Sequence, residues 1–348
     1  MRASFACLIL AATLSGAPAI AQTSPEPTSA EQTSAEQNAA EQNAAEQTSA
    51  EQPSAGRTSV EQTATDKPEV EHTIMAHSAV AAPSAAAQTC ANPDALGISR
   101  MVEIDTTGGP GFGLEQFKQH DFLRDHEVLL TFDDGPWPGN TPAVLKALAD
   151  HCTKATFFII GQHASYHPEL LRQIADAGHT IGTHTWSHKT LTRKSLTVDQ
   201  AKAEIEKGIS AVSLMLGRPA APFFRFPTLR HSAALISYLG ERNVAMFSTD
   251  VDSFDFRTRK PDQVIATTMT KLNKTGKGII LMHDFQHVTG EALPELLRQL
   301  KAGGFKIVHM RAKDSVKTLA EYDELVRKDA KLQRFSERPT ANVVRTVE

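Results

Sequence analysis

The sequence has little cysteine, with three in 348 residues, and no hydrophobic run long enough to suggest a membrane-spanning helix. The apolar stretch FACLILAATL near the N-terminus is too short to cross a bilayer. The chain also lacks the basic stripe that a nucleic-acid-binding protein needs. We therefore expect no transmembrane segment in the mature chain and no nucleic-acid partner.

The N-terminus has the pattern of a secretory signal. Met1 and Arg2 form a short basic region, the apolar stretch follows, and Ala19-Ile20-Ala21 fits a cleavage site with small residues. We interpret residues 1–21 as a cleaved signal peptide rather than an uncleaved anchor. An exported, periplasmic or secreted protein is the expectation.

Residues 22–89 have a different composition from the rest of the chain. They carry a drifting five-residue repeat, SAEQT, SAEQN, AAEQN, AAEQT and SAEQP, with almost no large apolar side chain. Burial therefore cannot offset the entropy lost on ordering. With ten acidic and two basic residues, this segment is predicted to be a disordered acidic linker. A helix packed on the following domain is the alternative.

The two cysteines after the signal are Cys90 and Cys152. Two thiols in an exported chain suggest one disulfide. Such a bond would tie residues 90–125 to the following domain, and we interpret these residues as an N-terminal extension packed on it.

From about residue 126 onward, strand-like and helix-like runs alternate, which favours a parallel sheet. The strand-like runs are 127–132, 155–160, 179–183, 222–226, 243–249, 278–282 and 305–310. Helix-like stretches lie between them, with Ser, Thr or Pro near several starts and Gly at several ends. We predict an α/β domain over residues 126–312, and a surface helix with a tail over residues 313–348.

Ionisable residues follow five of these runs at the predicted strand C-termini. They are Asp133, Asp134, His184, His188, Arg225, Asp252 and His283. An open doubly wound sheet gathers its ligand at one switch point, whereas a barrel collects residues from many strand ends. Contributions from five strands therefore favour a distorted (β/α) barrel of about seven parallel strands.

Asp134, His184 and His188 are the candidate metal ligands. The two imidazoles are four residues apart in HTWSH, and they share a face if that segment turns helically. Two His and one carboxylate, with one position left open, form the pattern of a catalytic zinc site, although cobalt or nickel also suits it. Taken alone, the DDGP segment could equally be a solvated turn.

The remaining charged residues each have two interpretations. Arg225, the only charge in APFFRFP, needs an anion, which is either a structural acid or Asp133. Asp252 and Asp255 could be turn residues. His283 could be a core residue, but beside a metal site a general acid is favoured.

These motifs, in this order, resemble the polysaccharide deacetylase family of carbohydrate esterases over roughly residues 126–310. The resemblance implies a distorted (β/α) barrel, Asp133 as base, His283 as acid, and Arg225 orienting Asp133. It also implies that Asp252 supports His283 and that Leu281 lines an acetyl-methyl pocket. Two positions depart from the family pattern: Thr228 replaces an aromatic residue, and Phe256 replaces Trp.

The resulting hypothesis is a metal-dependent hydrolase that removes N-acetyl groups from an amino-sugar polysaccharide such as peptidoglycan or a chitin-like oligomer. An O-acetyl esterase acting on a glycan such as xylan is one alternative, and a degenerate glycan-binding protein is another. The expected partner is the acetylated polysaccharide itself, and the expected oligomeric state is a monomer.

Overall fold

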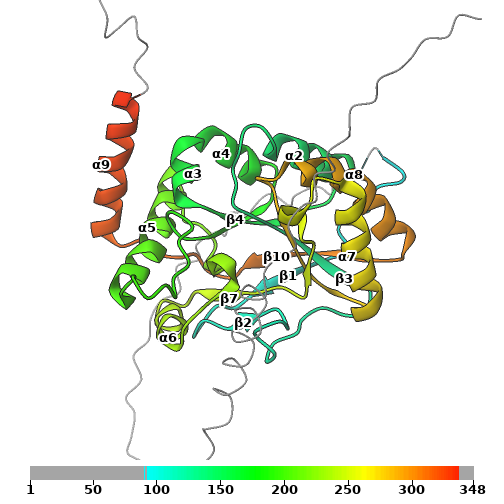
Figure 1. The fold of residues 1–348 in the computed structure, drawn as a ribbon, viewed down its shortest axis with the longest axis horizontal. Coiled ribbons are helices and arrows are strands. Elements are labelled where there is room, and N and C mark those ends of the chain that lie inside the picture. The colour runs from blue at the N-terminus through cyan, green and yellow to red at the C-terminus, as the bar shows by residue number, and fades with distance from the viewer. Residues whose placement is uncertain (1–89, 91, 337–348) are drawn as a thin grey trace, which may run out of the picture. The chain divides into compact units, whose positions relative to one another are not determined.

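The computed structural model describes residues 90 and 92–336 of the chain. The predicted signal peptide (residues 1–21) and linker (residues 22–89) lie outside the described residues, as does the predicted tail beyond residue 336. Figure 1 shows strands at the centre of the described residues and helices around them. Within this part of the chain, no helix is both long and apolar enough to cross a membrane.

All seven predicted strands are present, and all of their pairings are parallel. They are β3 (Glu127–Asp133), β4 (Thr156–Ile159), β5 (Thr180–Thr183), β6 (Phe223–Phe224), β7 (Ala245–Phe247), β9 (Gly278–His283) and β10 (Lys306–Ala312). Every residue of β3 is buried. A parallel strand covered on both faces needs an almost continuous apolar run, which is why these strands could be read from the sequence.

The sheet closes on itself. Its order runs β10-β3-β4-β5-β6-β7, and β8 (Val251–Asp252) continues the segment that begins with β7. β8 pairs with β9, and β9 pairs with β3. The predicted distorted (β/α) barrel is therefore confirmed.

The core has two parts because successive side chains of a strand point to opposite faces. Leu129, Phe158 and Phe247 belong to one buried cluster, and the alternate residues Leu130 and Phe157 belong to a second, larger cluster that includes the helices.

Helices connect the strands in chain order. They are α2 (Thr141–Asp150), α3 (Gly161–Tyr166), α4 (Pro168–Asp176), α5 (Val198–Leu216), α6 (Ala233–Glu241), α7 (Pro261–Thr275) and α8 (His287–Ala302). α5 shows the expected end signals: Thr197 forms a capping box with Gln200, and Gly217 ends the helix with a φ of 72°. Of these seven helices, the six-residue α3 was not predicted, since fewer than two turns leave no periodic pattern to detect.

Residues before the barrel add two short strands to the sheet. β1 (Arg100–Ile104) pairs with β10, and β2 (Gly111–Phe112) pairs with β7. Cys90 forms a disulfide with Cys152, as the cysteine count suggested. Cys152 lies between the end of α2 and the start of β4, so the bond is at the N-terminal end of the barrel strands.

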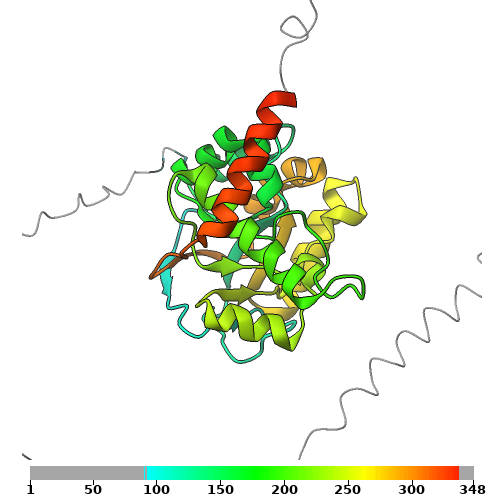
Figure 2. The same ribbon diagram turned by 90° about the vertical axis from the view of Figure 1, so that its left-hand side faces the viewer.

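A final helix, α9 (Ala320–Ser336), follows the barrel and runs beside α5 (Figure 2). Its Val326 is fully buried in a small cluster with Trp186 and Ala211. Lys207 of α5 lies 4.0 Å from the centre of the Trp186 ring, and its Nζ is 2.5 Å from Oδ2 of Asp329. Trp186 belongs to the HTWSH segment, so α9 contacts the turn that carries both candidate histidine ligands.

Candidate active site

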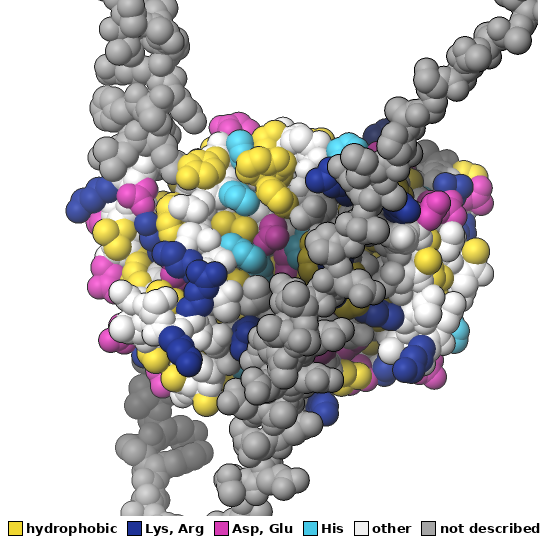
Figure 3. Space-filling view, viewed as in Figure 1, with side chains coloured by type: hydrophobic (Ala, Val, Ile, Leu, Met, Phe, Trp, Pro, Cys, Tyr) yellow, Lys and Arg dark blue, Asp and Glu magenta, His cyan; other side chains and the backbone are white. Residues whose placement is uncertain are grey.

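The candidate residues lie at one end of the barrel. Asp133, Asp252 and His283 are the last residues of β3, β8 and β9, while His184 and Arg225 directly follow β5 and β6. On the face seen in Figure 3, histidine and acidic side chains meet near the centre with hydrophobic side chains beside them. Parallel strands thus bring together residues up to 150 positions apart, as the sequence pattern implied.

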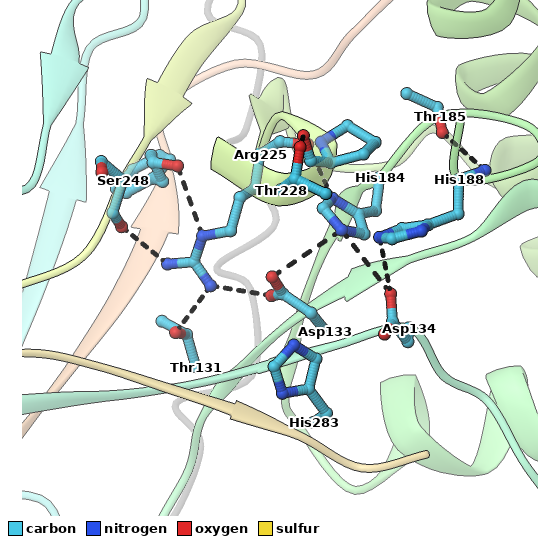
Figure 4. Close-up of polar contacts among 12 residues, drawn as sticks. Thr131, Asp133, Asp134, His184, Thr185, His188, Arg225, Thr228, Ser248 and His283 are labelled. Atoms are coloured by element: carbon cyan, nitrogen blue, oxygen red, sulfur yellow. Dashed lines mark hydrogen bonds and ion pairs between the residues drawn. The ribbon is translucent and has the colours of Figure 1, made fainter. Parts of the chain in front are cut away.

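Asp134, His184 and His188 form a compact group whose ligand atoms all lie within 4.8 Å of one another. Oδ1 of Asp134 is 3.6 Å from Nε2 of His184 and 3.3 Å from Nε2 of His188 (Figure 4). Ligand atoms about 2.0–2.2 Å from one tetrahedral ion lie roughly 3.3–3.6 Å apart. Oδ1 of Asp134 is buried and has no hydrogen-bond partner among the described residues. The donor set, spacing and unpaired oxygen all fit one divalent ion.

Neighbouring groups keep His184 in the neutral tautomer that can bind such an ion through Nε2. Its Nδ1 donates to the backbone oxygen of Arg225 at 2.7 Å, so the lone pair of the neutral ring is on Nε2. Burial holds the pKa of His184 well below its ordinary value, and the nearby His188 lowers it further. His184 is therefore an uncharged imidazole whose Nε2 faces Asp134.

The turn carrying His188 is also fixed. The N–H of His188 donates to Oγ1 of Thr185, and the N–H of Ser187 donates to Glu204 of α5. A Cβ added at Gly208 of α5 would lie 2.5 Å from the backbone of Thr185, so only glycine allows the helix to approach this closely.

Asp133 lies beside the group but is bound differently. Its Oδ1 accepts from Nη1 of Arg225 at 2.7 Å, and its Oδ2 is 3.8 Å from Nε2 of His184. Arg225 is fully buried and donates also to Thr131 and to the backbone oxygens of Phe247 and Ser248. Burial raises the pKa of Asp133 to about 6, although Arg225 acts to lower it. Of the two interpretations of Arg225, the structure shows the contact with Asp133.

His283 faces Asp133 in Figure 4 and is held from behind by Asp255. Nδ1 of His283 lies 2.7 Å from Oδ1 of Asp255, and the backbone N–H of His283 donates to Oδ2 at 2.7 Å. Thr289 also donates to Oδ2. Burial acts to lower the pKa of His283, but the Asp255 carboxylate outweighs it, and the pKa rises to about 10.

The expectation that Asp252 supports His283 is thereby corrected. Oδ1 of Asp252 accepts the backbone N–H of Phe254, and its backbone oxygen accepts from Lys271. Asp252 is therefore a turn residue, which was the other interpretation. Asp252 and Asp255 are three residues apart in one irregular turn, and sequence spacing does not show which of them faces His283.

The three expected substrate-pocket residues surround this centre. Leu281 is buried in β9, two residues before His283. Phe256 is 47% exposed and meets the His283 ring edge-on at 5.5 Å. Thr228 follows Pro227 with a φ of 57°, and Figure 4 shows it beside His184. Phe256 presents an exposed aromatic face next to His283, where a substrate can contact it.

One residue near the centre was missed. His163 was interpreted from the sequence as structural or surface, yet its Nδ1 lies 2.5 Å from the backbone oxygen of Asp134. It also lines a pocket of about 210 Å³ together with Asp134 and His188. No sequence pattern indicates this contact, because α3 is short and lies in none of the five motifs.

Comparison with known proteins agrees with the geometry. Residues 122–246 match the sequence profile described as polysaccharide deacetylase. A chitooligosaccharide deacetylase of Azorhizobium caulinodans is 34% identical over 161 residues, which cover 45% of this chain and 73% of that protein. The chain belongs to the polysaccharide deacetylase family.

Two peptidoglycan deacetylases show similar identity to this chain. The peptidoglycan-N-acetylmuramic acid deacetylase PdaC of Bacillus subtilis is 32% identical over 196 residues, covering 56% of this chain and 40% of that protein. The peptidoglycan-N-acetylglucosamine deacetylase of Bacillus cereus is 32% identical over 186 residues, covering 52% and 66%. The chain thus spans less than two thirds of either relative.

Solved structures support the family fold. A peptidoglycan deacetylase of Bdellovibrio bacteriovorus is 33% identical with a TM-score of 0.56, covering 62% of this chain and 59% of that one.

Proposed function

We propose that this protein is a metal-dependent deacetylase that hydrolyses N-acetyl groups on an amino-sugar polymer such as peptidoglycan or a chitin-like oligomer. The observation that carries the proposal is the pairing of a three-residue ligand group with two further proton-transfer groups, Asp133 and His283, at the same barrel end. The family membership and the named activities of its relatives support the same class of reaction.

Asp134, His184 and His188 would hold the ion, with zinc the best match and cobalt or nickel also compatible with the donors. When bound, a divalent ion supplies a Lewis acid that polarises the acetyl carbonyl and increases the acidity of water. Three protein ligands leave room for a substrate oxygen, which is the arrangement of catalytic rather than structural sites.

Asp133 is proposed as the base. It is separate from the ligand group, and the buried Arg225 guanidinium favours its ionised form. It would take a proton from the attacking water while the water oxygen bonds to the acetyl carbon. The backbone N–H of Thr228 is the proposed donor to the oxyanion that develops on the carbonyl oxygen.

His283 is proposed as the acid. Asp255 keeps its ring protonated, and the ring lies on the other side of Asp133 from Arg225 (Figure 4). The proton passes to the sugar nitrogen as the carbon–nitrogen bond breaks, so that acetate and a free amine leave. Proton transfer of this kind typically contributes about 10²–10⁴-fold to a rate.

Leu281 is proposed to line the pocket for the acetyl methyl group, and Phe256 is proposed to contact the adjoining sugar. Export to the periplasm or the medium is proposed for the protein. The Cys90–Cys152 bond supports this, because disulfides persist in oxidising compartments. Cell-wall glycans are found in the same compartments.

The test is acetate release by the zinc-loaded protein from peptidoglycan, N-acetylglucosamine oligomers and acetylated xylan. We expect release from the amide substrates and none from an Asp133→Asn control. Release from xylan alone would instead identify an O-acetyl esterase. Tight glycan binding without release from any substrate would identify a binding protein.

A further inference from the structure

His163 contacts a candidate metal ligand with one edge of its ring. Its Nδ1 lies 2.5 Å from the backbone oxygen of Asp134. A carbonyl oxygen can only accept a hydrogen bond, so Nδ1 carries the proton. In the neutral ring, Nε2 is then a hydrogen-bond acceptor. Among the described residues, no group donates to this Nε2.

The His163 ring is also fixed in orientation. Phe285 stacks on it with ring centres 6.0 Å apart and planes 14° apart, and Trp137 packs against it at 5.3 Å. The packing and the hydrogen bond to Asp134 therefore hold the ring in one orientation, and this also fixes the position of Nε2.

A pocket beside the candidate metal group is lined by His163. It has a volume of about 210 Å³, and its lining residues are Asp134, Ile160, Gln162, His163, Ser187, His188 and Phe285. The lining thus combines the polar residues Gln162 and Ser187 with the apolar residues Ile160 and Phe285. Ligand pockets commonly combine such apolar walls with a few fixed polar groups.

We propose that His163 is a substrate-binding residue whose Nε2 accepts a hydrogen bond from a sugar hydroxyl of the glycan next to the metal site. This inference rests on the proposed function for its class of ligand. Nε2 of His163, as an acceptor, needs a hydrogen-bond donor from the ligand, and hydroxyl groups are the most numerous donors on a sugar. The same residue positions Asp134 through Nδ1, so its two ring nitrogens have separate roles.

Two substitutions separate these roles. The amide of His163→Asn can occupy the place of Nδ1 and donate to the Asp134 carbonyl, but it does not reach the place of Nε2. The longer amide of His163→Gln reaches the place of Nε2 instead. We therefore expect Asn to keep metal affinity and lose sugar affinity, and Gln to show the reverse.

The experiment measures binding of an N-acetylglucosamine tetramer by calorimetry. Each zinc-loaded variant also carries Asp133→Asn, so that the tetramer is not consumed. Loss of one hydrogen bond should raise the dissociation constant of His163→Asn by about 2- to 12-fold. Zinc affinity, measured by competition with a chelating dye, should fall only for His163→Gln. With Asp133 intact, His163→Asn should raise KM and leave kcat within about twofold.

Equal tetramer affinity for His163→Asn and its parent would overturn the proposal, as would a parent that binds no tetramer. Tetramer binding that depends on His163, together with no acetate release by the unmodified protein, would support this inference and contradict the proposed function. The two failures are therefore distinguishable.

Discussion

His283 and Asp255 are joined by two hydrogen bonds of 2.7 Å each, one from the imidazole Nδ1 and one from the backbone N–H. Both bonds end on the same buried carboxylate, which Thr289 also contacts. The carboxylate therefore sets the orientation, the tautomer and the charge of the ring together.

Replacing Asp255 tests this relationship. Asp255→Asn removes the charge that keeps His283 protonated, so kcat should fall by about 10²-fold or more. Asp252→Asn is the matched control, since the Asp252 carboxylate accepts from the backbone of its own turn and its backbone oxygen accepts from Lys271. It should stay within a few-fold of the unmodified rate. A larger loss from Asp252→Asn than from Asp255→Asn would reverse the assignment.

Metal content should depend on the ligand group and not on the base. His184→Ala should lose stoichiometric zinc, because only Asp134 and His188 remain. Asp133→Asn should retain zinc while losing most of kcat. Elemental analysis of both purified proteins, after incubation with zinc and desalting, gives the answer. One zinc per chain in His184→Ala would remove His184 from the site.

Activity should have a bell-shaped dependence on pH. In the proposed mechanism Asp133 must be ionised, and its raised pKa of about 6 places the acid limb there. A bound cation favours the carboxylate and moves that limb to lower pH. As the proposed acid, His283 must be protonated, so activity should fall as pH rises through its pKa of about 10.

The alkaline limb has its own control. Asp255→Asn removes the main cause of the raised His283 pKa, so the limb should shift to lower pH. Rates measured from pH 4 to 11 on a soluble oligomer would show both limbs. An alkaline limb that does not move in Asp255→Asn would exclude His283 as its origin.

Much of this site could be predicted from the sequence, and the reason is physical. Asp133 and His283 end strands that are buried on both faces, and such strands are continuous apolar runs. Strand ends are therefore visible as the first ionisable residue after the run. The same signal located His184 and Arg225.

The remainder depended on features that leave no pattern. The first four residues of β1 alternate between half-exposed and exposed positions at the sheet edge, and β8 has two residues. The irregular turn, in which Phe254 has a φ of 53°, determines whether Asp252 or Asp255 faces His283. His163 reaches Asp134 only because β4 pairs with β3. Such contacts follow from tertiary structure rather than from local composition.

The disulfide should stabilise the protein without affecting catalysis. It closes a segment of 62 residues, and loss of such a link typically costs about 2–4 kcal/mol of unfolding free energy. A Cys90→Ala/Cys152→Ala variant should unfold at lower denaturant concentration, with kcat unchanged. A reductant should destabilise the unmodified protein but not this variant. Equal denaturation midpoints for the two proteins would contradict the prediction.

The C-terminal helix should matter for metal affinity. Val326 of α9 is fully buried against Trp186, so Val326→Asp places a charge in an apolar contact. Detachment of α9 would loosen the turn between His184 and His188 and weaken zinc binding. Leu325→Asp is the control, because Leu325 is 45% exposed. Chelator competition measures the zinc affinity of both variants. Unchanged zinc affinity in Val326→Asp would contradict the predicted link between α9 packing and metal binding.

The place of the Cys90–Cys152 bond has a geometric consequence. Cys152 lies where α2 ends and β4 begins, whereas the candidate catalytic residues lie at the opposite ends of the strands. The disulfide therefore lies on the side of the barrel that faces away from the candidate catalytic residues. The covalent link and the candidate catalytic rim thus occupy opposite ends of the barrel, so a large molecule can approach the rim without meeting the disulfide.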